Sequence, residues 1–248
     1  MYSPLQKLLS ALLLIISICL VSLSLWSNLA ALLSQSAPFQ QITSSPAPSE
    51  TTYPASALGI STARVSTPSS LYAKAYCLLD ADSGRVLFGK ESDQKLPMAS
   101  TTKIMTCIIA LENADLKDTV TFSSHAASMP DVQLNASSGE TFRLIDLLHS
   151  LMLESHNDTA VAIAEHVGGS VEGFADLMNR KAEELGCTRT YFVTPNGLDA
   201  KEHYTTAREL CLIARYAIQN KRFLKIIQTP NYSFSNTKGT RTFAIRNH

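Results

Sequence analysis

The chain has 248 residues, of which 45% are hydrophobic and 17% are charged, and its 21 Lys and Arg residues balance 21 Asp and Glu residues. This composition excludes a disordered chain, and the balanced charge gives no electrostatic basis for binding nucleic acid. We therefore expect one globular domain with accessory sequence, and no nucleic-acid partner.

The accessory sequence is N-terminal. Residues 8–33 contain no charged residue, and Lys7 stands immediately before them. This pattern predicts a signal peptide or an uncleaved signal anchor over residues 1–33. Because no basic residue follows until Arg64, we expect the rest of the chain to lie outside the membrane. A Ser/Thr/Pro-rich stretch predicts a linker over residues 34–70, which leaves residues 71–248 for the folded domain.

The first elements expected in this domain are a hairpin and a buried helix. Ala73–Leu79 and Arg85–Gly89 are short apolar runs on either side of turn residues, which predicts the hairpin. Met98–Leu111 is apolar nearly all round, which predicts a buried helix. A short strand is expected at Val120–Phe122, followed by a loop through Gly139.

Helical spacing continues through the middle of the chain and gives way to strands near its end. Helices are predicted over Thr141–Glu154, Thr159–Val167, Val171–Leu185 and Thr206–Gln219, with Thr205 as the last N-cap and residues 155–158 as the first break. Extended segments are predicted at Tyr191–Val193, Tyr232–Phe234 and Arg241–Ile245, the last two forming a second hairpin. This order of elements is typical of an α+β domain.

The sharpest chemical feature is a serine and a lysine one helical turn apart, Ser100 and Lys103, at the start of the expected buried helix. Residues three apart share a helix face, so the hydroxyl and the amine can form a hydrogen bond. Burial lowers the pKa of a lysine and lets its neutral amine accept the serine proton. The helix N-terminus also presents backbone N–H groups to a developing oxyanion. The alternative is an N-cap serine with a lysine that extends to solvent, because this spacing is common by chance.

A second polar cluster, Ser155-His156-Asn157, separates two of the expected helices. A serine hydroxyl there can relay a proton between the lysine and a leaving group, and an asparagine amide can hold a substrate carbonyl. Taken alone, the cluster is better explained as polar caps on the neighbouring helices.

With these motifs the chain resembles the penicillin-recognising serine hydrolases, most closely the D-alanyl-D-alanine carboxypeptidases, from about Tyr72 to its end. The similarity rests on segments in the same order, at residues 78–87, 97–106, 153–160, 194–199 and 204–210. It implies the α+β serine β-lactamase/DD-peptidase (transpeptidase-like) fold. It also implies the nucleophile Ser100, its general base Lys103, the proton relay Ser155 and the substrate-binding residue Asn157.

Two features depart from the family pattern. Many relatives have Gly at position 156, so His156 is expected to alter how open that side of the site is. The family also needs Lys-Thr/Ser-Gly on a strand, and no such tripeptide occurs. Lys238-Gly239-Thr240 has the right composition in the wrong order, and we interpret it as the turn of the second hairpin. We expect the motif shortly beyond His248, in a catalytic domain that is incomplete at its C-terminus.

The resemblance implies a reaction that uses no metal or cofactor. Ser100 attacks the carbonyl of the penultimate D-Ala of a peptidoglycan stem peptide, the terminal D-Ala leaves, and water hydrolyses the acyl-enzyme. β-Lactam antibiotics are expected to acylate the same serine. The expected location is extracytoplasmic, either secreted or anchored to the cell membrane and facing the cell wall. The alternatives are a serine β-lactamase and a non-catalytic wall-binding remnant that lacks the third motif.

Other reactive side chains form no motif of their own. The histidines form no H-E-x-x-H zinc site, and His203 is expected in a polar loop. The cysteines of the domain lie among apolar neighbours and are interpreted as buried thiols. A disulfide is compatible with a location outside the cytoplasm, but the sequence indicates no pairing among Cys77, Cys107, Cys187 and Cys211.

Overall fold

The computed structural model describes residues 71–248. The expected signal segment, residues 1–33, and the expected linker, residues 34–70, lie outside the described residues. Within residues 71–248, no helix is both long enough and apolar enough to span a bilayer.

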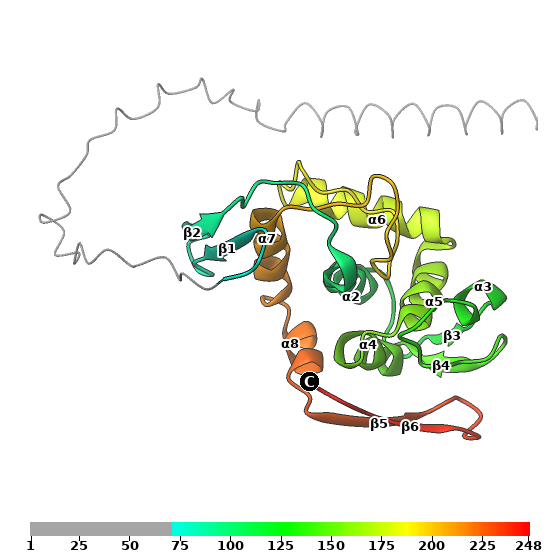
Figure 1. Ribbon diagram of the computed structural model, residues 1–248. Helices are drawn as coiled ribbons and strands as arrows, with labels where there is room; N and C mark the ends of the chain where they lie inside the picture. Colours follow the sequence, from blue (N-terminus) through cyan, green and yellow to red (C-terminus); the bar gives the residue numbers. More distant parts are fainter. Residues whose placement is uncertain (1–70) are drawn as a thin grey trace, which may run out of the picture. The chain divides into compact units, whose positions relative to one another are not determined.

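The described residues begin and end with a pair of strands, and the chain between these pairs is mainly helical (Figure 1). The helices are α2 (Thr102–Asn113), α3 (Ser124–Ala127), α4 (Leu144–Leu153), α5 (Asn157–Gly168), α6 (Val171–Glu184), α7 (Ala207–Ala217) and α8 (Lys221–Ile227), and the 3-10 turn η2 (Ala99–Thr101) precedes α2. The strands are β1 (Tyr76–Leu79), β2 (Val86–Lys90), β3 (Thr119–Thr121), β4 (Thr141–Arg143), β5 (Asn231–Ser235) and β6 (Thr242–Arg246). Strands at both ends with helices between them confirm the predicted α+β class.

Helix α2 lies at the centre of the domain, and α4, α5, α6, α7 and α8 contact it (Figure 1). Its sequence explains this position, because every side chain from Met105 to Leu111 is buried. A helix that is apolar around its whole circumference needs other elements on all sides. The buried helix predicted over Met98–Leu111 is confirmed, although its first turn, Ala99–Thr101, is 3-10.

The strands of the described residues pair as antiparallel two-stranded sheets, β1 with β2, β3 with β4, and β5 with β6. The first and last pairs confirm both predicted hairpins. Phe142 on β4 joins two of the sheets, because its ring contacts Phe122 at 5.5 Å and Phe243 at 5.7 Å between centroids, both edge-on. Edge-on aromatic pairs stabilise a core beyond the area that they bury.

The structure corrects the helix predicted over Thr141–Glu154. Residues 141–143 form β4, and α4 begins only at Leu144. Phe142 is fully buried among aromatic rings, so core packing and pairing with β3 override the helical spacing. Two short helices were not predicted: α3 lies in the expected loop before Gly139, and α8 follows α7.

Smaller differences concern helix starts and one extended segment. Helix α5 begins at Asn157, inside the predicted break, because the Asn157 N–H donates to the Val132 carbonyl at 2.7 Å. Helix α7 is capped by Thr206, not Thr205; the Thr206 hydroxyl accepts the Glu209 N–H, whereas the Thr205 backbone pairs with Leu96. In the segment predicted at residues 191–193, only Tyr191 forms a bridge.

Candidate active site

The structure places the Ser100 hydroxyl and the Lys103 amine next to each other. Lys103 Nζ lies 3.1 Å from Ser100 Oγ. Ser100 lies in the exposed 3-10 turn η2, whereas Lys103 is one residue into α2 and only 2% exposed. The hydroxyl is therefore accessible to a substrate while the amine beneath it is shielded from water.

The surroundings of Lys103 favour its neutral form. Besides Ser100, its amine donates to Asn157 Oδ1 at 2.9 Å and to the Asn196 carbonyl at 2.7 Å. None of these acceptors carries a charge that would stabilise an ammonium group. Burial lowers the pKa of Lys103 to about 8. In the neutral state the amine can still donate to Asn157 and Asn196, and its lone pair then faces the Ser100 hydroxyl.

Asn157 connects Lys103 to the loop before α4. Its side-chain amide donates to the carbonyls of Pro130 at 3.1 Å and Asp131 at 2.9 Å, while its oxygen accepts from Lys103. The side chain is buried and its hydrogen-bonding capacity is used by the protein itself. These contacts hold the direction of the Lys103 amine. The substrate-binding role expected for Asn157 stays a prediction.

A turn at residues 195–197 contacts η2 and α2 next to Ser100. The Thr106 hydroxyl donates to the Pro195 carbonyl at 2.6 Å, one helical turn after Lys103. Gly197 has a φ of +86°, and a Cβ atom there would lie 1.9 Å from the Ala99 carbonyl oxygen. Only glycine fits this position, because any side chain would collide with the backbone of Ala99 and Ser100. No pattern in the sequence predicts this contact.

Ser155 lies in the short connection between α4 and α5, two residues before Asn157, with a φ of +62°. Its side chain is half-buried. Within residues 71–248, its hydroxyl forms no hydrogen bond to Ser100 or Lys103. The structure thus brings Ser100, Lys103 and Asn157 into contact, and the relay role of Ser155 stays a prediction.

The comparisons with known proteins identify the family of the chain. A family model described as D-alanyl-D-alanine carboxypeptidase matches residues 61–248. This chain belongs to that family. The D-alanyl-D-alanine carboxypeptidase DacF of Bacillus subtilis is 37% identical over 162 residues, which are 63% of this chain and 42% of that protein.

Solved structures of the same kind have the same fold. The D-alanyl-D-alanine carboxypeptidase from Mycobacterium tuberculosis H37Rv aligns with a TM-score of 0.66 and 32% identity over 71% of this chain and 66% of that chain. Penicillin binding protein 5 from Haemophilus influenzae aligns with a TM-score of 0.64 and 29% identity over 73% of this chain and 54% of that chain. The predicted DD-peptidase fold is confirmed. The chain spans about half the length of the curated relatives that it matches.

The histidine between Ser155 and Asn157 faces inward. The His156 ring is buried and its Nδ1 lies 2.7 Å from the Ser150 hydroxyl of α4. Burial lowers the pKa of His156, which favours a neutral ring. Its side chain therefore packs against α4. The expectation that His156 alters how open that side of the site is stays a prediction.

A second histidine, His203, which was expected in a polar loop, contacts the start of α2. His203 lies in a loop but is buried, and its Nδ1 accepts the Val193 N–H at 3.0 Å. The proton of the neutral ring is therefore on Nε2, which donates to the Thr102 hydroxyl at 2.9 Å. Since Thr102 lies between Ser100 and Lys103, this contact fixes the start of α2. A lone histidine in a polar sequence context gave no signal for it.

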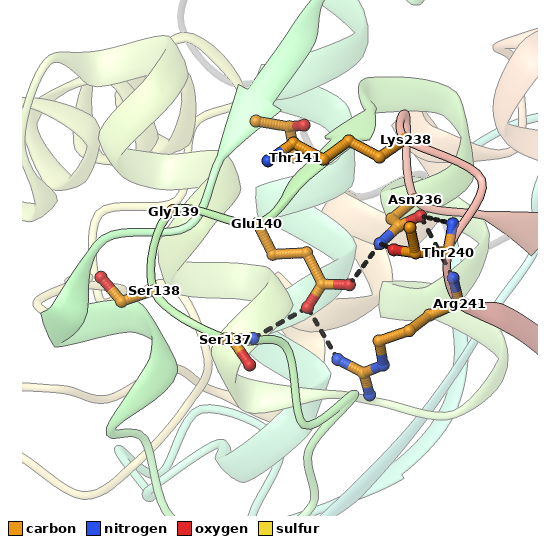
Figure 2. A pocket seen from close by; sticks show the side chains of 9 residues that line it. All are labelled: Ser137, Ser138, Gly139, Glu140, Thr141, Asn236, Lys238, Thr240 and Arg241. Atoms are coloured by element: carbon orange, nitrogen blue, oxygen red, sulfur yellow. Dashed lines mark hydrogen bonds and ion pairs between the residues drawn. The ribbon is translucent and has the colours of Figure 1, made fainter.

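Lys238-Gly239-Thr240 does not take the place of the third motif of the carboxypeptidases. Gly239 has a φ of +68° and its N–H donates to the Asn236 carbonyl, which confirms that these residues form the turn between β5 and β6. The turn borders a polar pocket of about 290 Å³ (Figure 2), and neither Ser100 nor Lys103 lines it.

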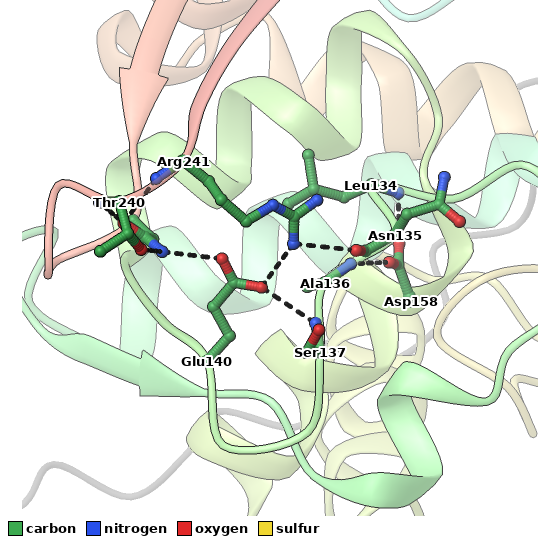
Figure 3. A network of polar contacts seen from close by, with 9 residues as sticks. Leu134, Asn135, Ala136, Ser137, Glu140, Asp158, Thr240 and Arg241 are labelled. Carbon is green, nitrogen blue, oxygen red and sulfur yellow. Dashed lines mark hydrogen bonds and ion pairs between the residues drawn. The ribbon is translucent and has the colours of Figure 1, made fainter.

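A polar network fastens this hairpin to the loop beside Asn157 (Figure 3). Arg241 donates to Glu140 Oε2 at 2.7 Å and to the Asn135 carbonyl at 3.1 Å. The carboxylate of Asp158, the residue after Asn157, accepts the Leu134 N–H at 2.9 Å. The loop that carries residues 130–140 is therefore held at both ends, at the hairpin and at the start of α5.

Proposed function

We propose that this chain carries the acylation machinery of a serine-type D-alanyl-D-alanine carboxypeptidase, which removes the terminal D-Ala from peptidoglycan stem peptides. We also propose residues 71–248 as its catalytic domain, residues 1–33 as a signal peptide or anchor and residues 34–70 as a linker. The observation that carries the proposal is the buried Lys103 amine, 3.1 Å from the exposed Ser100 hydroxyl and surrounded by uncharged acceptors.

In the proposed reaction, neutral Lys103 accepts the Ser100 proton while Oγ attacks the carbonyl carbon of the penultimate D-Ala. The negative charge that develops on the carbonyl oxygen is stabilised by the Ser100 backbone N–H at the N-terminal end of η2 and α2. The departing amine of the terminal D-Ala then takes a proton from Lys103 through the Ser155 hydroxyl. Water hydrolyses the acyl-enzyme and regenerates Ser100.

Asn157 has two proposed roles that can be separated experimentally. Its contacts support a positioning role, because its oxygen accepts from the Lys103 amine. Binding of a substrate carbonyl requires its amide to exchange one bond, to Pro130 or Asp131, for a bond to the substrate. A substrate-binding role therefore raises KM when Asn157 is changed, whereas the positioning role lowers the acylation rate.

The proposed location follows from the substrate. Peptidoglycan stem peptides lie outside the cytoplasmic membrane, so we propose that the domain is extracytoplasmic and tethered to the membrane through residues 1–33. Extraction of a membrane fraction at high salt and at alkaline pH tests the tether. A tethered chain stays in the pellet, whereas a chain released in both washes contradicts anchoring.

Covalent labelling with a fluorescent penicillin, followed by peptide mapping, tests the enzymatic proposal. The labelling uses the 248-residue chain and, in parallel, the chain extended by its downstream coding sequence. We expect an adduct on Ser100, its loss in Ser100→Ala and its retention in the matched control Ser138→Ala, which changes another exposed serine. If neither chain forms an adduct and muropeptide binding is unaffected by Ser100→Ala, the chain is a wall-binding remnant.

The lifetime of the adduct separates the carboxypeptidase from the β-lactamase that was the alternative. A carboxypeptidase keeps the penicilloyl group on Ser100 long after free penicillin has been removed, whereas a β-lactamase releases it within the assay. Release of D-Ala from a peptide ending in D-Ala-D-Ala, measured on the same sample, provides the second readout.

A further inference from the structure

Two cysteines far apart in the sequence lie next to each other at the edge of the domain. Cys77 is on β1 and Cys211 is on α7, and Cys211 Sγ lies 3.4 Å from the Cys77 carbonyl oxygen. Both cysteines are free in this structure and both are partly exposed.

A second contact holds the same two elements together one helical turn along α7. The Arg215 guanidinium donates to the carbonyls of Ala81 and Asp82, in the turn that follows β1, at 2.6 Å each. Residues 211 and 215 share one face of α7, so the helix meets the first hairpin at two points. The Arg215 contacts therefore help to keep Cys77 and Cys211 close together without involving sulfur.

The pair is also open to a reaction partner. Cys77, Cys211 and Ala214 line a cavity of about 230 Å³ that opens to solvent between β1 and α7. By contrast, Cys107 and Cys187 are buried in the core and no more than 2% exposed. Of the cysteines in residues 71–248, only Cys77 and Cys211 are both close to each other and partly exposed to solvent.

We propose that Cys77 and Cys211 form a disulfide that fastens the first hairpin to α7. Oxidation joins the two Sγ atoms, releases two protons and passes two electrons to a disulfide-bearing oxidant, which is itself reduced to two thiols. A compartment outside the cytoplasm, the location proposed above, is one in which such a bond persists. The bond closes a loop that contains η2, α2 and α5, and hence every proposed site residue.

Two physical consequences follow for the experiment. Because the cross-link spans more than half of the domain, it removes much conformational entropy from the unfolded chain and raises the Tm by roughly 5–15 °C. Burial and the neighbouring Cys77 thiol raise the pKa of Cys211 to about 11. Thiolates are the reactive form, so uncatalysed oxidation is slow at neutral pH and is carried out for hours at mildly alkaline pH.

The test uses the full chain with Cys19→Ser, incubated with oxidised and reduced glutathione, then alkylated and digested with trypsin. We expect a cross-linked pair of peptides, residues 75–85 with residues 209–215, and a Tm increase that a reducing agent reverses. Cys77→Ser and Cys211→Ser are matched controls that lose both the cross-link and the response of Tm to oxidant.

Several results would overturn the proposal. These are alkylation of both cysteines in the oxidised native protein, glutathione retained on either one, or a cross-link to Cys107 or Cys187. A cross-link that forms only after denaturation counts against it equally. Because the oxidised and reduced forms of the same Cys19→Ser chain are compared directly, the result does not depend on the folding of the Cys77→Ser or Cys211→Ser variant.

Discussion

The amine of Lys103 lies 2.9 Å from the side-chain oxygen of Asn157, although the two residues are in the first turns of different helices. The amide oxygen accepts a hydrogen bond from the amine and so fixes its direction. Because it is uncharged, it stabilises the ammonium form less than a carboxylate would. The α5 residue therefore influences both where the lysine points and how easily it loses its proton.

This relationship predicts the effect of Asn157→Asp. A carboxylate beside Lys103 favours the ammonium form and should raise the midpoint of the pH–acylation profile by about 1–3 pH units. Rates of penicillin acylation between about pH 6 and pH 10 measure the shift. Asn113→Asp at the exposed end of α2 is the control and should leave the midpoint unchanged. An unchanged midpoint in Asn157→Asp would contradict the positioning role.

Acylation of the wild-type chain should itself depend on pH in a defined direction. Because the neutral amine is the active base and burial lowers the pKa of Lys103 to about 8, acylation should increase with pH and level off above that value. Lys103→Ala should reduce acylation on the order of a hundredfold or more and remove this dependence. Lys95→Ala, whose ammonium group lies over the Tyr204 ring, is the matched control. Wild-type rates in Lys103→Ala would refute the base assignment.

Gly197→Ala should damage the site through sterics alone. The new Cβ would collide with the Ala99 carbonyl, and we expect a loss of about 3 kcal/mol or more in the free energy of unfolding. Gly239→Ala has a similar positive φ and no atom within 4 Å of the new Cβ, so it should cost only about 1 kcal/mol. Urea denaturation gives the free energy of unfolding of each variant. Both variants lose stability because a residue with a Cβ atom has a positive φ, so the additional loss in Gly197→Ala measures the clash. Equal losses of unfolding free energy in the two variants would show that the contact between Gly197 and Ala99 is unimportant for stability.

The network around Glu140 should contribute modestly to stability. Arg241→Met removes the partly exposed ion pair with Glu140 and the hydrogen bond to the Asn135 carbonyl, and we expect a loss of about 1 kcal/mol in the free energy of unfolding. Arg222→Met, at an exposed position on α8, should change the free energy of unfolding by less than about 0.5 kcal/mol. A loss that disappears in the Glu140→Gln background would assign the effect to the ion pair.

The parts of the structure that depend on local spacing could be predicted from the sequence. Ser100 and Lys103 are one helical turn apart, so their contact needs only a helix, and both hairpins have turn residues between short apolar runs. Residues 141–143 could not be assigned in this way, because the burial of Phe142 depends on rings contributed by distant strands.

The rest of the site depends on backbone atoms that have no sequence signature. The acceptor from residue 196 is a main-chain carbonyl, which every amino acid possesses. His203 stands in a polar stretch, and its burial follows from the folding of Val193 and Thr102 around it. Contacts of this kind become visible only when the whole domain has folded.

The contact between Gly197 and Ala99 affects the order in which the parts of the proposed site form during synthesis. Ser100 and Lys103 leave the ribosome together, but the carbonyl of Asn196 and the close approach of Gly197 arrive almost a hundred residues later. A nascent or partly translocated chain that ends before this turn holds both reactive groups without the support that aligns them. The nucleophile is therefore assembled late, after most of the domain has been synthesised.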